Sequence, residues 1–159
     1  MWIVFARCSR RLGVVEVARS SSFTIVSDDL PWGLHRVRCL ETGGFAVGGF
    51  YSSRPDVCSI DNIDSGFPRS FPRRGVGSLL LGRWLSDMYR RGCRVFCSNP
   101  YSESAGALYA RFVRWGVLGE PVDWFESGKP SCWRIVRDPA PVVEEMSSRG
   151  LLRGKSLSP

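Results

Sequence analysis

A glycine-containing turn followed directly by an amphipathic segment constrains this chain more than any other feature. The turn runs from Pro72 to Ser78, with glycines at positions 75 and 77, and the segment after it runs from Leu79 to Gly92. Apolar residues recur in that segment at the spacing of one helical face: Leu80, Leu81, Trp84, Leu85 and Met88. The pattern predicts a buried helix that begins at the glycine turn and ends at Gly92.

The start of that helix is a candidate anion-binding site. The first N–H groups of a helix lack intrahelical partners and carry partial positive charge. Gly75 and Gly77 have no side chains, so a phosphate group could approach the backbone closely. Arg73 and Arg74 add formal positive charge beside these glycines. A tight turn without a ligand would show the same two glycines, so the turn alone does not decide between the two interpretations.

Length and composition indicate one globular domain. The chain has 159 residues, of which 43% are hydrophobic and 23% charged, enough to bury a sizeable core. The apolar start, Met1 to Ala6, breaks at Arg7 and is too short for a membrane span or the core of a signal peptide. We therefore expect a cytoplasmic protein with a single domain over residues 1–138 and a C-terminal tail over residues 139–159.

The cysteines and the single histidine limit the chemistry open to the chain. None of the six cysteines forms a C-x-x-C pair, and the closest two, Cys93 and Cys97, lack the flanks of a zinc site. Most lie in apolar or strand-like runs, so buried free thiols are expected, as in a reducing cytosol. Because His35 is the only histidine, neither a His-based metal site nor Ser–His–Asp catalysis is favoured, and no metal is expected.

The net charge of +7 is carried almost entirely by arginine. A basic balance of this kind can attract nucleic acid or a phosphorylated cofactor. The arginines are scattered rather than massed, which does not favour nucleic acid as a partner. A sheet that binds RNA would also interleave aromatic residues with the arginines, and the strand predicted from Leu34 to Glu41 has only the arginines.

The segments before the glycine turn predict an antiparallel meander. Its strands are Leu34 to Glu41, Phe45 to Tyr51 and Val57 to Asp64, the first two joined by a hairpin turn. Gly48 and Gly49 indicate a bulge or the close approach of another backbone. Nearer the N-terminus, extended structure is predicted for Trp2 to Cys8 and Phe23 to Val26, whereas Leu12 to Ser20 could be a helix or a strand.

The segments after the first helix complete a mixed sheet. Arg94 to Ser98 predicts a buried strand, which should run parallel to the strand before the glycine turn because a helix crosses over between them. A second helix is expected from Glu103 to Trp115, capped by Ser102. The remaining predictions are a final hairpin and a short helical piece, at Pro121 to Glu126, Cys132 to Val136 and Val142 to Ser148. The fold class is α/β (α+β), with a mixed, mostly antiparallel central sheet and flanking helices.

The order of these elements resembles that of the GNAT superfamily of N-acetyltransferases. The family's acetyl-CoA turn has the form Gln/Arg-x-x-Gly-x-Gly/Ala at a helix start, and the turn from Pro72 to Gly77 matches its last four positions. The family's second signature is Ala-x-x-Leu-Tyr-x-x-x-Gly-Phe. Its first half matches Ala105 to Tyr109, and Trp115 to Val117 resembles a stretched version of its end. The resemblance covers roughly residues 34 to 136 and implies a GNAT-like fold.

The resemblance implies an enzyme that transfers an acetyl group from acetyl-CoA to an amine acceptor by direct attack. Tyr109 would be the general acid that protonates the departing thiolate, and Asp61 or Asp64 would act as the base through water. The strand from Val57 to Asp64 would bind the pantetheine arm and polarise the thioester carbonyl through its backbone. The implied cofactor contacts are Arg73, Arg74, Gly75, Val76, Gly77, Ser78, Ile63, Asn99 and Ser102.

Two interpretations of the site therefore stand side by side. In the first, the partner is a small-molecule or peptide amine, and the enzyme works as a monomer or homodimer. In the alternative, the same scaffold is a non-enzymatic basic domain whose degenerate cofactor cleft binds protein or RNA. Pro72 favours the alternative, because it stands where the family has Gln or Arg and supplies no N–H. Tyr109 could then be a core aromatic, and Asp61 and Asp64 solvated carboxylates.

Overall fold

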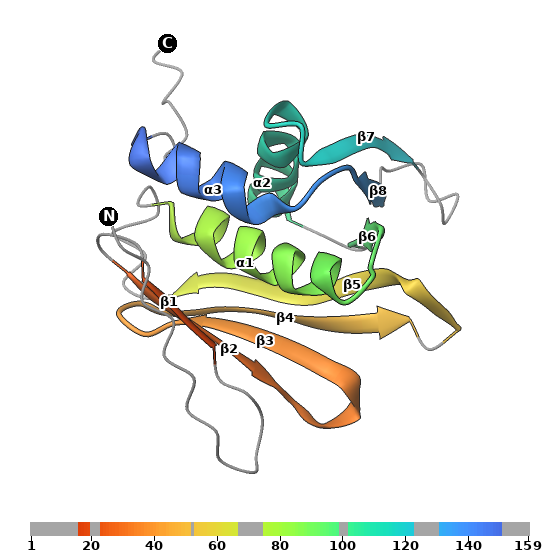
Figure 1. Cartoon of the computed structure of the whole chain (residues 1–159), viewed down its shortest axis with the longest axis horizontal. Coiled ribbons are helices and arrows are strands. Elements are labelled where there is room, and N and C mark those ends of the chain that lie inside the picture. Colours follow the sequence, from red (N-terminus) through yellow and green to blue (C-terminus); the bar gives the residue numbers. More distant parts are fainter. Residues whose placement is uncertain are drawn as a thin grey trace.

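An eight-stranded sheet with helices packed against it makes up the described part of the molecule (Figure 1). The computed structural model describes residues 16–19, 23–51, 53–66, 75–98, 102–122 and 131–150. The strands are β1 (Glu16–Arg19), β2 (Thr24–Asp29), β3 (Leu34–Cys39), β4 (Gly43–Tyr51), β5 (Arg54–Gly66), β6 (Val95–Cys97), β7 (Leu118–Val122) and β8 (Cys132–Ile135). The helices are α1 (Val76–Arg90), α2 (Glu103–Arg114) and α3 (Pro139–Ser148), with a 3-10 turn at Pro31–Gly33.

The sheet has the mixed topology that the sequence predicted. Its strand order is β1-β2-β3-β4-β5-β6-β8-β7, and among the described strands only the β5–β6 pair is parallel. That pair flanks the crossover through α1, as expected, since a parallel connection needs a long crossover. The predicted fold class, a mostly antiparallel mixed sheet with flanking helices and a strand–glycine turn–helix–strand unit, is therefore confirmed.

Helix α1 supplies the centre of the core. Its buried face is the one that the apolar spacing predicted, and each of these side chains is fully buried: Leu80, Leu81, Trp84, Leu85 and Met88. They pack with buried residues of the sheet such as Val37, Ala46 and Ile60. Full burial of one such apolar side chain contributes about 1.5–3 kcal/mol, so the layer between α1 and the sheet is a main source of stability. The helix begins at Val76, within the glycine turn at which the sequence predicted its start.

Gly48 allows α1 to pack closely on the sheet. A Cβ atom at this position would overlap the backbone of Ser59 and Ile60 and the ring of Trp84. The β4–β5 register also shifts between Val47 and Gly48. Both alternatives that the sequence suggested for this glycine, a bulge and a close approach, are confirmed.

A polar network with a buried centre ties the second half of α1 to β2 and β3. Its members are Ser27, Asp29, His35, Arg83, Asp87 and Arg91, of which Asp29 and Arg91 are exposed. The His35 ring is 2% exposed and contacts Asp29 Oδ1 through Nδ1 at 2.8 Å and Asp87 Oδ2 through Nε2 at 2.9 Å. The same Asp87 oxygen accepts from Ser27 Oγ at 2.8 Å and from Arg83 Nε at 3.1 Å. A buried carboxylate thus has several donors, the condition under which burying a charge is tolerated.

The charge state of Asp87 follows from these contacts. Burial by itself would raise the pKa of the carboxyl group, because the charged form loses its water. The hydrogen bond from His35, the charge of Arg83 and the hydrogen bond from Ser27 outweigh that effect, and the pKa of Asp87 lies below its ordinary value. The network therefore keeps Asp87 ionised inside the fold.

The C-terminal half adds two helices and a hairpin. Ser102 caps α2 as predicted, since its Oγ accepts a hydrogen bond from the Ala105 N–H at 3.2 Å. Helix α3 lies on α1, where Val143 fills the space left by Gly82. Strand β7 begins at Leu118 rather than at Pro121. Among the described residues, no helix is long and apolar enough to cross a membrane.

The N-terminal predictions are tested only in part. The ambiguous stretch from Leu12 to Ser20 contains strand β1 at Glu16–Arg19, so extended structure is present there. The segment predicted from Phe23 to Val26 contains the start of strand β2 at Thr24, and the strand continues beyond Val26 to Asp29. The strand predicted from Trp2 to Cys8 lies outside the described residues.

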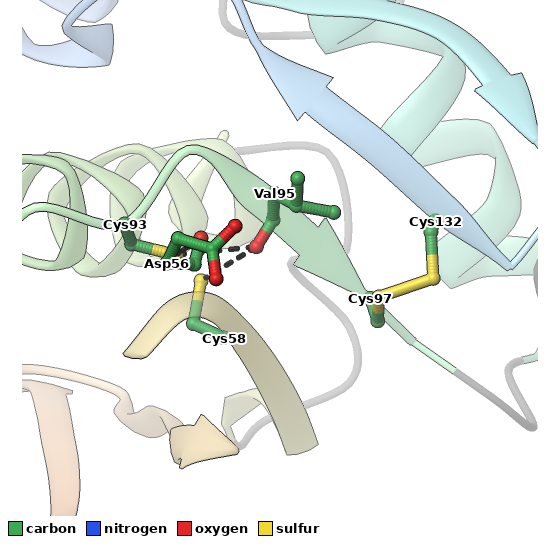
Figure 2. The surroundings of a disulfide bond; sticks show 6 residues. All are labelled: Asp56, Cys58, Cys93, Val95, Cys97 and Cys132. Atoms are coloured by element: carbon green, nitrogen blue, oxygen red, sulfur yellow. Dashed lines mark hydrogen bonds between the residues drawn. A yellow bond between two sulfur atoms is a disulfide. The ribbon is translucent and has the colours of Figure 1, made fainter. Parts of the chain in front are cut away.

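One pair of cysteines forms a disulfide that the sequence did not predict. Cys97 of β6 and Cys132 of β8 form a disulfide, whereas Cys58 and Cys93 nearby are buried and free, as predicted (Figure 2). Cys39 is buried and free as well. The expectation of free thiols was thus wrong for Cys97 and Cys132. The reason is positional, because the two are 35 residues apart in sequence but stand opposite each other in the β6–β8 register.

Replacing Cys97 and Cys132 together with serine should lower the free energy of unfolding by about 2–4 kcal/mol, the usual cost of losing a disulfide. Chemical denaturation under non-reducing conditions measures the difference. Addition of a thiol reductant should shift the denaturation midpoint of the parent protein to that of the double variant. The midpoint of the variant itself should not change. An equal number of reactive thiols in the denatured parent before and after reduction would contradict the disulfide.

Candidate functional site

Strands β5 and β6 pair along only the first part of β5. They pair in parallel at Val57↔Val95, Cys58↔Phe96 and Ser59↔Cys97, where β6 ends. Strand β5 continues to Gly66, and the described residues pair with this continuation only from the β4 side. An extended ligand with amide groups could therefore pair with the backbone of residues 60–66 as an added strand.

The two aspartates proposed as bases lie on this part of β5. The β4–β5 register skips Asp61 opposite Val47 and Gly48, so Asp61 is the extra residue of a β-bulge. Its side chain is exposed, as is that of Asp64, whose Oδ1 accepts from the Gly66 N–H at 2.8 Å. Ile63, an implied contact for the pantetheine arm, is half-buried between them.

Tyr109 of α2 places its hydroxyl next to the point where β5 and β6 stop pairing. Its OH and the Oγ of Ser98, the residue directly after β6, are 2.8 Å apart. The Tyr109 ring meets Phe96 of β6 edge-on, with centroids 5.2 Å apart, and Trp133 of β8 at 5.1 Å. The side chain is 1% exposed, so its polar group is held in an apolar surrounding, where electrostatic interactions are stronger than in water.

The first turn of α1 has the geometry that an anion site requires. Gly75 caps the helix in the left-handed conformation, with φ at 80°, which glycine adopts without steric cost. No acidic side chain stands in this turn to occupy its N–H groups. Arg111 of α2 instead donates from NH1 to Ser78 Oγ at 2.8 Å. Burial and the nearby charge of Arg114 lower the pKa of Arg111, the response of a cation that lacks full solvation.

Some of the predicted cofactor-binding residues lie together at the start of α1, whereas others are not among the described residues. Gly75, Val76, Gly77 and Ser78 form the start of α1, in which Leu79 N–H donates to Gly75 C=O at 3.1 Å. Ser102 is engaged as the cap of α2, with its Oγ also 2.9 Å from Ser104 Oγ. Arg73, Arg74 and Asn99 lie outside the described residues.

Two residues of the site were missed by sequence reasoning. Ser98 ends the predicted strand Arg94 to Ser98, and nothing in its spacing indicates a contact with Tyr109 on the following helix. Arg111 lies two positions after Tyr109, and it reaches Ser78 across 33 residues of sequence. The basic last turn of α2 was the only available signal for Arg111.

Comparisons with known proteins add little to this geometry. No protein-family model matches the chain, and no curated protein matches it in sequence. Among solved structures, it is similar to the crystal structure of a candidate acetyltransferase of the GNAT family from Desulfovibrio desulfuricans. The identity is 19% and the TM-score 0.48, over 65% of this chain and 69% of the other. At this level of similarity, a functional inference depends on the residues of the chain itself.

Proposed function

We propose that this protein is an acyltransferase that moves an acetyl group from acetyl-CoA to an amine acceptor, a small molecule or a peptide. One observation carries the proposal: the parallel strands β5 and β6 stop pairing after Ser59 and Cys97, and the hydroxyls of Ser98 and Tyr109 meet at that point. Such an arrangement offers unpaired strand backbone for an extended amide chain and a buried proton donor close to where that chain would enter.

The backbone of β5 would hold the pantetheine arm. That arm contains two amide groups, which can pair with residues 60–66 as a short extra strand would. Half-buried Ile63 would contact its apolar portion. The bulge at Asp61 supports this role, because bulges turn backbone groups out of the regular ladder and occur often beside active sites.

The start of α1 would bind the diphosphate of acetyl-CoA. The N–H groups that follow Gly75 carry the positive end of the helix dipole, and Gly77 has no side chain to obstruct an oxygen atom. Arg111 adds a formal positive charge at Ser78. A bound diphosphate would be attracted both by this charge and by the positive end of the helix dipole. Arg73 and Arg74 would contribute as outer charge partners.

The reaction would proceed by direct transfer, with acetyl-CoA supplying the thioester. The neutral amine attacks the thioester carbonyl, whose developing negative charge would be stabilised by a backbone N–H of β5. When the carbon–sulfur bond breaks, Tyr109 would give its phenolic proton to the leaving sulfur. The proton lost from the nitrogen would pass through water to Asp61 or Asp64, both of which are exposed.

Binding of acetyl-CoA at the start of α1 is tested by thermal unfolding of the parent and of Gly77→Asp. A Cβ at Gly77 would have ordinary contact with Leu108 at 3.6 Å, so the first side-chain atom is accommodated there without a clash. An acidic group in the first turn also suits the helix dipole, so the variant should fold as well as the parent. Acetyl-CoA at 100 times its dissociation constant should stabilise the parent by about 2.7 kcal/mol and leave Gly77→Asp unshifted.

Gly77→Asn is the matched control for this experiment, because it adds nearly the same volume without charge. It should retain a clear shift with acetyl-CoA, and Gly77→Asp should not. If millimolar acetyl-CoA fails to shift the parent, the transferase proposal is wrong and a non-enzymatic binding domain is the better interpretation. If Gly77→Asp binds as tightly as the parent, the diphosphate does not sit at the start of α1.

A further inference from the structure

The hydroxyls of Ser98 and Tyr109 form a hydrogen bond between two buried side chains. The side chains of Ser98 and Tyr109 are 3% and 1% exposed, and their oxygens are 2.8 Å apart. Ser98 also donates its backbone N–H to the Ser131 carbonyl at 2.8 Å. The Ser98 hydroxyl is therefore presented to Tyr109 from a position that its own backbone fixes.

We propose that Ser98 is the positioning residue for Tyr109 in the acyl-transfer reaction: its hydroxyl donates to the Tyr109 oxygen and directs the phenolic proton towards the leaving sulfur. This inference rests on the function proposed above. It assigns Ser98 a part that acts through Tyr109 rather than through a contact of its own with the substrate.

The direction of this hydrogen bond follows from what a general acid must do. A phenol has one proton, and that proton must point at the leaving sulfur when the carbon–sulfur bond breaks. The bond between the two hydroxyls must then run from Ser98 to Tyr109, so that the tyrosine oxygen is the acceptor. A donor at that oxygen also stabilises the negative charge that grows there as the proton leaves.

The surroundings hold both hydroxyls in place. Cys97, the residue before Ser98, is joined by a disulfide to Cys132, the residue after Ser131, so a covalent link lies next to the Ser98–Ser131 hydrogen bond. On the other side, the Tyr109 ring packs against Phe96 and Trp133, which also stack on each other with centroids 5.5 Å apart. A reacting group is effective when packing and supporting hydrogen bonds restrict its geometry, and this arrangement supplies both for Tyr109.

The proposal is tested with Ser98→Ala and Ser98→Thr in steady-state acetyl transfer. Ser98→Ala should lower kcat about 10-fold with the KM for acetyl-CoA unchanged, since a supporting donor is lost and no substrate contact is. Ser98→Thr keeps a hydroxyl on the same carbon and should recover most of kcat. Parental kcat in Ser98→Ala would overturn the proposal, as would an equal loss in both variants or a loss confined to KM.

A double-mutant cycle separates positioning from a structural role. In a Tyr109→Phe background, Ser98→Ala should change kcat little, because the group through which Ser98 acts has already been removed. The same 10-fold loss in both backgrounds would show that Ser98 acts independently of Tyr109 and would overturn the proposal. A parent that neither binds acetyl-CoA nor turns over would instead refute the transferase function, and the positioning role with it. A parent that is active but indifferent to Ser98→Ala would refute the positioning role alone.

Discussion

Replacing Tyr109 with phenylalanine should lower kcat about 10²–10⁴-fold, the range expected for loss of a general acid. Affinity for acetyl-CoA should change little, since phenylalanine keeps the ring that packs against Phe96 and Trp133. The variant should therefore separate catalysis from packing. Release of free CoA with a reactive amine measures kcat, and the thermal shift with acetyl-CoA measures binding.

Tyr89→Phe is the matched control for the Tyr109 variant. Tyr89 is also a helical tyrosine, and its ring lies under the Arg94 guanidinium, 4.0 Å from the centroid. Removing its hydroxyl should leave kcat at the parental value. If Tyr109→Phe transfers the acetyl group as fast as Tyr89→Phe, then Tyr109 is a core aromatic and the acid must be sought elsewhere.

Replacing Asp87 with asparagine should lower the free energy of unfolding by about 3–5 kcal/mol, the cost of removing one partner from a buried charged pair. Asparagine keeps the shape of the side chain but removes the charge that balances Arg83, and it brings an amide donor towards other donors. The contact between α1 and His35 of β3 would be weakened in the same step, because the carboxylate charge is removed. Urea denaturation followed by circular dichroism measures the change.

The control for Asp87 is Asp56→Asn, which breaks an exposed ion pair with Arg54. An exposed pair contributes little, so this variant should unfold at nearly the parental midpoint. Equal midpoints for the Asp56 and Asp87 variants would show that the buried polar network does not stabilise the fold.

The Asp87 variant should also change how stability depends on pH. Because the folded-state pKa of Asp87 lies below its ordinary value, its contribution is present above that ordinary value, about 3.9, and is lost as the pH falls through the folded-state pKa. The difference in unfolding free energy between parent and Asp87→Asn should therefore be full at neutral pH and shrink in acid. A difference that stays constant from neutral pH to pH 2 would contradict a depressed pKa.

Periodicity made the centre of the fold predictable. The spacing from Leu80 to Met88 identified the buried face of α1, because a helix that covers a sheet must repeat its apolar residues every three or four positions. The parallel β5–β6 pair followed from the crossover length. The start of β7 was less visible, since Gly119 and Pro121 resemble strand breakers. Proline is tolerated in β7 because that strand lies at the edge of the sheet.

Contacts between distant segments were not predictable from the sequence. The Cys97–Cys132 disulfide and the Arg111–Ser78 hydrogen bond both depend on which strands and helices become neighbours. A polar network such as that around Asp87 leaves no periodic signal, because its members are scattered polar residues of three elements, β2, β3 and α1. For the site, the glycine turn and Tyr109 were identified through family motifs, whereas Ser98 required the folded geometry.

The unequal lengths of β5 and β6 have a consequence for how such proteins diverge. A ligand held by main-chain groups along residues 60–66 is insensitive to most side-chain substitutions there, since every residue but proline presents the same N–H and C=O. Selection for this backbone binding would preserve the path of the strand rather than its amino-acid sequence. Distantly related proteins with this architecture can therefore share the same ligand-binding surface although their sequences along that strand are no longer similar.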